Sequence, residues 1–283
     1  MVLLVRLLIS LIISLGLVSG AALAKSNGKS KTRSEISKFL ADRELDPTVR
    51  YVVNNTLFTI YHEVGHLLVD KMDWPVIGRE EDVADNFATY VLLNQRRRSF
   101  QQALKDAALG WKLEDQFYGN NRDNSDFYAV HSLDLQRAFQ IVCMMVGEDR
   151  DNFYVTAQEW GIDRSRQASC KDDYAQISRS IERLLITDED SDNKINVSID
   201  YERAGPNLSL AYKALRESRL LESVAEDLRL NYGLHAEIKI RASRCSEANA
   251  FYDTTTSEII ICYELLQDYF TTINRYNALN NNN

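Results

Sequence analysis

The chain is 283 residues long, enough to bury the core of one large domain or two modest ones. Hydrophobic residues make up 45% of it and charged residues 26%, a balance typical of soluble globular proteins and not of disordered or membrane-spanning ones. Its 33 basic and 41 acidic side chains give a net charge of -8, so the composition argues against a nucleic acid partner.

The first 24 residues, MVLLVRLLISLIISLGLVSGAALA, have the layout of a secretory signal peptide. A single basic residue, Arg6, precedes an apolar run from Leu7 to Val18, and small residues lead to a predicted cleavage site after Ala24. An uncleaved membrane anchor is the alternative, but the run is shorter than the about 20 residues that span a bilayer. Under either interpretation we expect a secreted or periplasmic protein, which meets a membrane only if this segment is retained.

A polar lead-in, residues 25–35, precedes a long region, residues 36–186, in which apolar residues recur mainly at helical spacing. The pattern is interrupted at Pro47 and again at Pro75, because proline cannot continue a helix. Two further segments have the same helical spacing: residues 99–119 and residues 131–147. We interpret residues 36–186 as one helical region.

The acidic, polar stretch from Thr187 to Pro206 is interpreted as a linker or a surface excursion between two halves. Residues 207–277 then combine helix and strand. The predicted elements are, in order, a helix over 208–232, a strand over 236–243, a hairpin with its turn at 254–257, and a helix from Tyr263. The whole pattern predicts an α+β fold, mainly helical with a small sheet, whose two regions pack together as one unit.

The four cysteines predict two disulfides, because an exported protein meets an oxidising environment. Three pairings are possible for Cys143, Cys170, Cys245 and Cys262. We favour the local pairs, Cys143 with Cys170 and Cys245 with Cys262, since each closes a short loop within one structural unit. A four-thiolate zinc site is the competing interpretation, but no two cysteines have the close Cys-x-x-Cys spacing that such sites usually show.

The segment HEVGH, residues 62–66, has the pattern His-Glu-x-x-His. Positions i and i+4 share one face of a helix, so His62 and His66 can reach a single ion while Glu63 addresses a water bound to it. Neighbouring apolar residues recur at helical spacing and predict an amphipathic helix. The pentapeptide alone is a weak signal, because it arises by chance in roughly one chain in a hundred of this length.

A third ligand should come from a second element, because a catalytic zinc ion takes three protein ligands and leaves one position for water. The segment EEDVAD, residues 80–85, supplies candidates. Glu81 and Asp85 stand at i and i+4, so if Glu81 binds the metal, Asp85 points the same way and can hold a ligand histidine by its free ring nitrogen. Glu80 and Asp82 are the alternative ligands, but on a helix they point away from the face of Asp85.

A histidine pair followed by Glu-x-x-x-Asp on the next helix resembles the gluzincin metallopeptidases, such as the thermolysin-like enzymes. Residues 61–88, together with QRAFQIVCMMVG (136–147) and NAFYDTTTSEIIICYELL (249–266), also resemble a family of exported bacterial proteins classed as metallopeptidases. This resemblance covers most of the mature chain. It implies a zincin-like fold, one Zn2+ ion per chain and a peptide or protein substrate.

The resemblance also implies roles for individual residues. His62, His66 and Glu81 would be the zinc ligands, and Asp85 would support a ligand histidine. Glu63 would be the general base that activates the zinc-bound water to attack a peptide carbonyl. The competing interpretation of the whole cluster is a solvated acidic helix face beside two buried histidines.

Peptide hydrolysis also needs a group that stabilises the oxyanion beside the metal. His131 is the best candidate, because it is one of only four histidines and lies six residues before Arg137, similar to a His/Arg pair in some other zinc peptidases. A surface histidine at a helix start is the alternative interpretation, and Tyr128 is a weaker candidate for the same role. His235 has no acidic or cysteine partner in pattern and is interpreted as structural.

The segment NAFY, residues 249–252, is similar to an Asn-Ala-x-Tyr strand of neprilysin-like zinc peptidases, which precedes the zinc helix and lines the substrate cleft. Here the segment follows the histidine pair instead. We therefore hypothesise a permuted arrangement, in which the C-terminal hairpin forms the edge sheet over the zinc helices and Asn249 and Ala250 bind an extended substrate. A disulfide-tied core hairpin is the alternative.

These observations predict a secreted or periplasmic zinc-dependent metallopeptidase that hydrolyses peptide bonds with a zinc-activated water. One alternative is a non-catalytic exported zinc-binding protein, and another is an amidase that acts on cell-wall peptides. Glu63 argues against the first alternative, since a structural zinc site has no need of a base.

Overall fold

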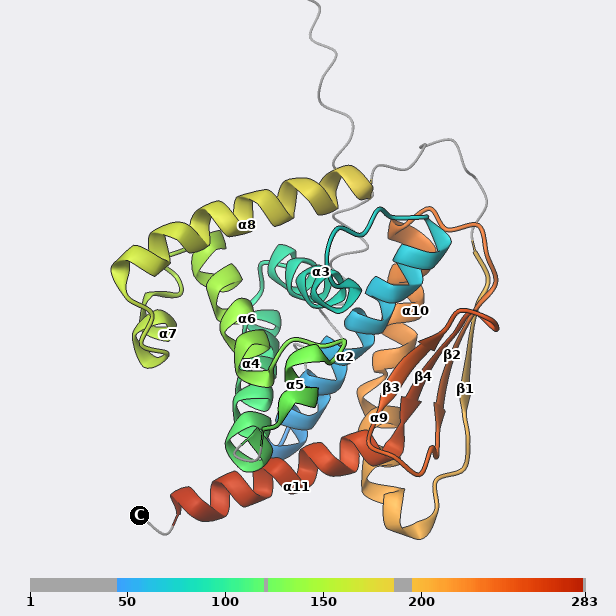
Figure 1. Cartoon of the computed structure of the whole chain (residues 1–283). Coiled ribbons are helices and arrows are strands. Elements are labelled where there is room, and N and C mark those ends of the chain that lie inside the picture. The colour runs from blue at the N-terminus through green and yellow to red at the C-terminus, as the bar shows by residue number, and fades with distance from the viewer. Residues whose placement is uncertain (1–44, 120–121, 186–194, 282–283) are drawn as a thin grey trace, which may run out of the picture.

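The computed structural model describes residues 45–119, 122–185 and 195–281 (Figure 1). The predicted signal peptide, residues 1–24, and the lead-in, residues 25–35, lie outside these ranges and stay predictions. Within the described part of the chain, a group of helices lies beside one four-stranded sheet. The predicted α+β fold, mainly helical with a small sheet, is confirmed.

The long helix α2, Pro47–Lys71, runs through the middle of the molecule (Figure 1). Asp46 fixes its start, because the aspartate side chain accepts hydrogen bonds from the backbone N–H groups of Thr48 and Val49. The proline in the first turn begins the helix at no cost, since an N–H group there has no helical partner. The sequence predicts an amphipathic helix, but nearly every side chain from Tyr51 to Leu68 is buried, because α2 has neighbours on several sides.

The other helices form three groups around α2. Three helices pack most extensively against it: α3 (Glu80–Asn94), α4 (Arg98–Tyr118) and α11 (Tyr263–Asn280). Further along the same side lie α5 (Asn124–Tyr128), α6 (Asp134–Glu148), α7 (Tyr154–Glu159) and α8 (Arg164–Leu184). On the side of the sheet lie the short 3-10 helix η2 (Pro206–Leu208), α9 (Ser209–Ser218) and α10 (Leu220–Asn231).

The sheet has the strand order β1-β2-β4-β3. Its strands are β1 (Val197–Tyr201), β2 (Ile238–Ser243), β3 (Ala250–Asp253) and β4 (Glu258–Cys262). The first three in this order run parallel, whereas β3 pairs antiparallel with β4 and forms an edge of the sheet. The predicted C-terminal hairpin is therefore present as β3 and β4.

Two predictions for this half of the chain are wrong. The stretch Thr187–Pro206, interpreted as a linker, contains β1, which pairs with β2 along its whole length. The single helix predicted over residues 208–232 is divided into α9 and α10. Arg219 separates them, because it adopts the left-handed conformation with φ of 54°, which a continuing helix does not permit.

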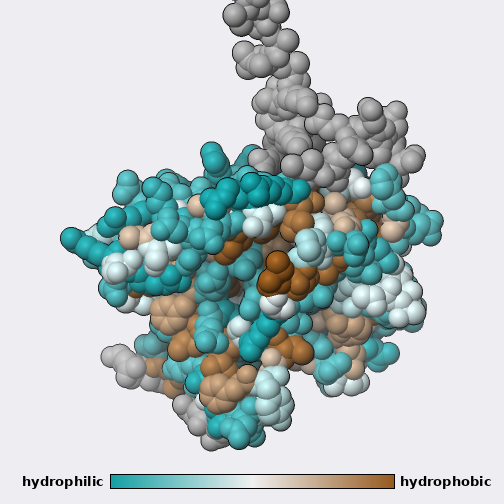
Figure 2. Space-filling model, turned by 45° about the horizontal axis from the view of Figure 1, so that its top comes forward, coloured by the Kyte–Doolittle hydropathy of each residue, from teal (hydrophilic) through white to brown (hydrophobic). Residues whose placement is uncertain are grey.

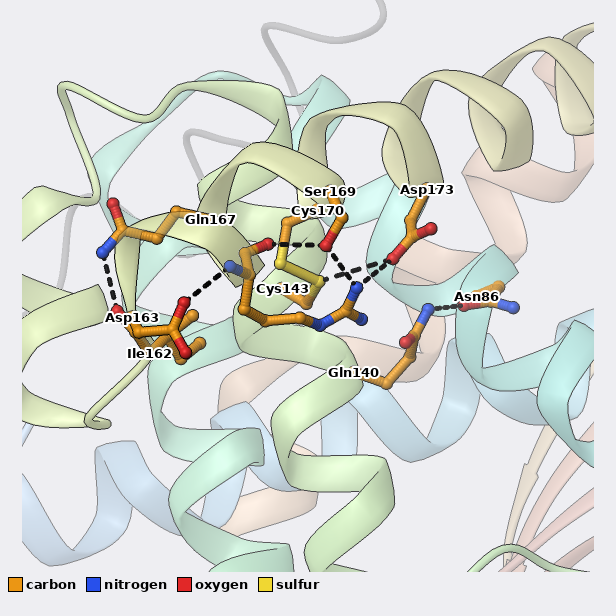
Figure 3. Close-up of a disulfide and its surroundings, with 10 residues drawn as sticks. Asn86, Gln140, Cys143, Ile162, Asp163, Gln167, Ser169, Cys170 and Asp173 are labelled. Atoms are coloured by element: carbon orange, nitrogen blue, oxygen red, sulfur yellow. Dashed lines mark hydrogen bonds and ion pairs between the residues drawn. A yellow bond between two sulfur atoms is a disulfide. The ribbon is translucent and has the colours of Figure 1, made fainter.

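Two disulfides tie these elements together. Cys143 and Cys170 join α6 to the outer helix α8 (Figure 3). Cys245 and Cys262 join the loop after β2 to the end of β4. These are the local pairs favoured from the sequence. The surface that α8 turns to solvent is largely hydrophilic, while hydrophobic residues gather towards the middle of the face seen in Figure 2.

One hydrophobic cluster extends from α2 and its neighbouring helices into the sheet. The edge strand β3 lies against α2, where the hydroxyl of Tyr252 donates a hydrogen bond to Oδ2 of Asp70 at 2.6 Å. The C-terminal hairpin and the His-Glu-x-x-His helix are therefore neighbours in space. Among the described residues, every helix is too short or too polar to cross a membrane.

Candidate metal centre

The candidate site lies where α2 meets the first turn of α3. Gly65 allows α2 and α3 to approach each other closely, since a Cβ at this position would lie 2.7 Å from Cα of Ala84 and 3.0 Å from its Cβ. His62 and His66 therefore face Glu81 across a helix contact that only glycine allows.

Three side-chain atoms converge between the two helices. Nε2 of His62 lies 3.2 Å from Nε2 of His66, and Oε2 of Glu81 lies 3.1 Å from the first nitrogen and 3.3 Å from the second. Ligands bound tetrahedrally to zinc at about 2.0 Å lie roughly 3.3 Å from one another. Two imidazoles and one carboxylate at this spacing therefore suit a zinc ion with one coordination position left for water.

The other ring nitrogen of each histidine is held by a carboxylate. Nδ1 of His62 donates to Oδ1 of Asp85 at 2.8 Å, and Nδ1 of His66 donates to Oε1 of Glu80 at 2.8 Å. In the neutral imidazole these bonds leave Nε2 without a proton, which is the form that binds a metal. Glu80, the alternative third ligand, therefore lies behind His66 and not beside Glu81.

Asp85 is itself held by a buried cation. Arg137 of α6 donates to both oxygens of this carboxylate, from Nε at 2.7 Å and from Nη2 at 2.8 Å. The guanidinium also stacks on Trp111, with Cζ 3.5 Å from the ring centroid. Burial opposes ionisation of Asp85, but the charge and hydrogen bonds of Arg137 keep its pKa well below its usual range. The result is a chain of contacts from Trp111 to the imidazole of His62.

Protons occupy the cluster when no cation is bound. Burial disfavours the imidazolium form, but hydrogen bonds with Asp85 and Glu81 raise the pKa of His62 to about 9. Burial likewise opposes ionisation of Glu81, yet hydrogen bonds from His131, His62 and His66 hold its pKa well below its usual range. A metal ion would displace these protons, because metal ligands must be deprotonated.

Glu63 lies on the wall of the same cavity and is only 5% exposed. Burial raises the pKa of its carboxyl group, although the charges of His62 and His66 act in the opposite direction. A buried carboxylate with a raised pKa beside a metal site has the properties expected of a general base.

His131 reaches the cluster from the loop before α6. Its Nε2 lies 2.7 Å from Oε2 of Glu81, and its ring stacks on that of His62 with the centroids 6.0 Å apart. Arg79 holds the loop by donating a hydrogen bond to the carbonyl of His131 at 3.2 Å. His62, Glu81 and His131 form a second set whose ligand atoms lie within 4.8 Å of one another. His131 is therefore close enough to act either on a bound substrate or on the ion.

The remaining candidates from the sequence lie outside the centre. Asp82 accepts a hydrogen bond from the hydroxyl of Ser132 at 2.8 Å, which links α3 to the loop of His131. Tyr128 is exposed and does not belong to the cavity lining. His235 is an exposed residue between α10 and β2.

A cavity of about 1060 Å³ opens over the histidines. Its floor is one stripe of α2, and its walls come from α4, the loop before α6, strand β3 and α11. Asn249 and Ala250 belong to this lining, together with Phe251 and Tyr252. The C-terminal hairpin therefore shares the cavity with His62, as the permuted arrangement requires.

Sequence reasoning missed the end of the cavity that α4 and α11 form. Glu114 of α4, Asp268 and Tyr269 of α11 line it, and the hydroxyls of Tyr269 and Thr59 lie 2.9 Å apart. These residues match no motif, and α4 and α11 are distant in sequence. The only sequence signal for this end of the cavity was the presence of acidic residues on two amphipathic helices. Such residues are common on solvated helix faces, so they did not indicate a site.

A histidine pair with one buried member, a converging glutamate and a wide cavity above them are typical of metal-dependent hydrolases. The chain belongs to a family described as "Putative metallopeptidase", whose sequence model matches residues 23–185 and 202–283. No curated protein and no solved structure matches the chain significantly. The predicted membership of a metallopeptidase family is confirmed, and the family implies a metal and a peptide or protein substrate.

Proposed function

We propose that the protein is a zinc-dependent peptidase in which His62, His66 and Glu81 hold the ion and Glu63 is the general base. The proposal depends on the triangle of ligand atoms, 3.1, 3.2 and 3.3 Å on its sides, next to a buried carboxylate. Membership of the family supports a metal and a peptide substrate.

Zinc, when bound, polarises a substrate carbonyl and makes water a better nucleophile. Glu63 accepts the proton of the attacking water and passes it to the leaving amine, a role suited to a carboxyl group whose pKa burial raises. His131 donates a hydrogen bond to the oxyanion. Asp85 and Arg137 keep the imidazole of His62 in one tautomer and one orientation.

The edge strand β3 is the proposed docking site for the substrate backbone. It lines the cavity, and β4 is the only strand that pairs with it in the described part of the chain. An extended peptide can add to such an edge by backbone hydrogen bonds, with Asn249 and Ala250 at the entrance. This is the permuted, zincin-like arrangement hypothesised from the sequence.

We also propose that the protein acts outside the cytoplasm, in the periplasm or after secretion. The two disulfides support this location, since such bonds persist in oxidising compartments. The predicted signal peptide supports it independently.

The test compares the wild type with Glu63→Gln, and uses Glu159→Gln, an exposed residue at the end of α7, as the control. Zinc content is measured by elemental analysis and activity by hydrolysis of an unfolded protein. We expect Glu63→Gln to retain zinc and lose about 100- to 10,000-fold in rate, because general base catalysis contributes this much. The control should keep both zinc and activity.

Other results would favour the alternatives. A wild type that binds zinc but hydrolyses no peptide would be a non-catalytic zinc-binding protein. Hydrolysis confined to cell-wall peptides would identify an amidase. Equal activity in the wild type and Glu63→Gln would contradict the assigned base.

A further inference from the structure

The end of the cavity away from the metal centre carries two acidic side chains, Glu114 of α4 and Asp268 of α11. The floor of the cavity follows α2 from His62 past Thr59 to Tyr51. Eleven residues of helix separate Tyr51 from His62, which corresponds to about 16 Å along the axis. Glu114 and Asp268 line the same cavity as His62, so a peptide that lies along this floor from the metal centre passes them.

No basic side chain of residues 45–119, 122–185 and 195–281 forms an ion pair with either acid. Burial, and then the charge of Asp268, raises the pKa of Glu114 to about 7. Burial also raises the pKa of Asp268. Two half-buried carboxylates that repel each other and have no cation destabilise the free protein, so their position calls for a ligand that compensates them.

Two buried hydroxyl groups of the cavity lining, one on α2 and one on α11, also have no partner in the described part of the chain. The hydroxyl of Tyr51 and Oγ1 of Thr272 are buried and form no hydrogen bond, although the two residues are only 2% and 3% exposed. Unsatisfied buried polar groups are rare in native proteins because each one costs free energy. Both hydroxyls can accept hydrogen bonds, which again indicates a ligand that donates them.

Apolar side chains also line this end of the cavity, beside the hydroxyls of Thr59 and Tyr269. They are Phe58 of α2, Trp111 of α4 and Leu265 of α11. A small hydrated cation gains nothing from these apolar side chains and is too small for the space. A lysine or arginine side chain fits both the apolar side chains and the two acids. Its aliphatic stem packs on apolar surface while its charged head meets carboxylates.

We propose that Glu114 and Asp268 form a subsite that binds a lysine or arginine side chain of the substrate. This inference rests on the proposed peptidase function and names the substrate class: peptides with a basic residue near the cleaved bond. The hydroxyls of Tyr51 and Thr272 complete the subsite by accepting hydrogen bonds from the charged head.

The test uses alanine-based octapeptides that carry lysine, arginine, norleucine or glutamate at each position in turn. Norleucine has the four-carbon stem of lysine without its ammonium group. Values of kcat/KM are measured for the wild type, for the double variant Glu114→Gln/Asp268→Asn, and for the control Glu159→Gln/Asp172→Asn. Both control residues are exposed and lie outside the cavity lining, so the two double variants change the net charge equally.

We expect the wild type to prefer lysine or arginine over norleucine at one position by roughly 10- to 100-fold, as hydrogen-bonded charges contribute. The preference should disappear in Glu114→Gln/Asp268→Asn and persist in the control. Hydrolysis without this preference, or a preference that survives in the double variant, would overturn the subsite and leave the peptidase function intact.

Binding separates this proposal from the peptidase function. Fluorescence anisotropy with labelled copies of the same peptides is measured on the zinc-loaded Glu63→Gln protein, with and without the Glu114→Gln/Asp268→Asn changes. The lysine peptide should bind more tightly than the norleucine peptide, and only when both acids are present. If this is observed although the wild type hydrolyses no peptide, the subsite stands and the peptidase function fails. Equal binding of the two peptides overturns the subsite.

Discussion

Replacing Gly65 by alanine tests the helix contact that brings the proposed ligands together. The added Cβ would lie 2.7 Å from Cα of Ala84, 3.0 Å from its Cβ and 3.4 Å from its carbonyl oxygen. Ala84 is fully buried, and its Cα cannot rotate out of the way as a flexible side chain could. The helix α3 must therefore move away from α2 and carry Glu81, one turn earlier, with it.

The expected change in the free energy of unfolding combines two opposing effects. Overpacking of a core costs about 1–3 kcal/mol, and the contact with a backbone atom favours the upper end of this range. Alanine in place of a helical glycine regains about 1 kcal/mol. The net loss of about 2 kcal/mol should lower Tm by about 4–8 °C in a protein of this size. Displacement of Glu81 should also weaken zinc binding by at least about tenfold.

Thermal unfolding of the metal-free protein, followed by circular dichroism, measures the first effect, and zinc titration against a chelator of known affinity measures the second. Gly205→Ala is the control, because no atom lies within 4 Å of a Cβ at that position. A Gly65→Ala protein whose free energy of unfolding stays within about 0.5 kcal/mol of the wild type, with unchanged zinc affinity, would refute the reasoning.

Two further predictions concern buried charges. Arg137→Leu leaves the carboxylate of Asp85 buried without its cation, so urea unfolding should show a loss of about 3–5 kcal/mol, whereas the exposed Arg179→Leu should change little. Burial raises the pKa of Glu114 in the folded protein from its ordinary 4.5 to about 7, so the folded state binds more protons and loses stability as pH rises through this window. Glu114→Gln should therefore have a free energy of unfolding about 1 kcal/mol higher than the wild type at pH 8, after allowance for solvent screening, and should unfold at a higher temperature there. Below pH 4.5 the two proteins should unfold at the same temperature. If the difference in stability between the wild type and Glu114→Gln is the same at pH 8 and below pH 4.5, the raised pKa is contradicted.

Helical periodicity made part of the site predictable. His62 and His66 share a face of α2 because any α-helix places residues i and i+4 together, whatever surrounds it. The same rule places Glu81 and Asp85 on one face of α3. The interruption at Pro75 predicted correctly that these pairs belong to two separate helices.

Other parts of the fold depended on distant pairing. The strand β1 lies in an acidic, polar stretch, and only its five residues carry a strand pattern, in which Val197, Ile199 and Tyr201 alternate with polar residues. So short a pattern becomes a strand because β2 offers a parallel partner. The break at Arg219 has no proline or glycine to announce it. Local sequence therefore signals β1 only weakly and the break at Arg219 not at all, and tertiary contacts can override local propensity.

The sequence by itself determined which groups can meet on one helix: the histidine pair, the neighbouring Glu63, and the Glu81–Asp85 pair. Only the tertiary structure decided which acid faces the histidines, because that choice depends on how closely α2 and α3 approach at Gly65. It also decided that Arg137 holds Asp85, and that Glu114 and Asp268 line the same cavity. Helical spacing is a local property of the chain, whereas contacts between helices follow from the packing of a whole core.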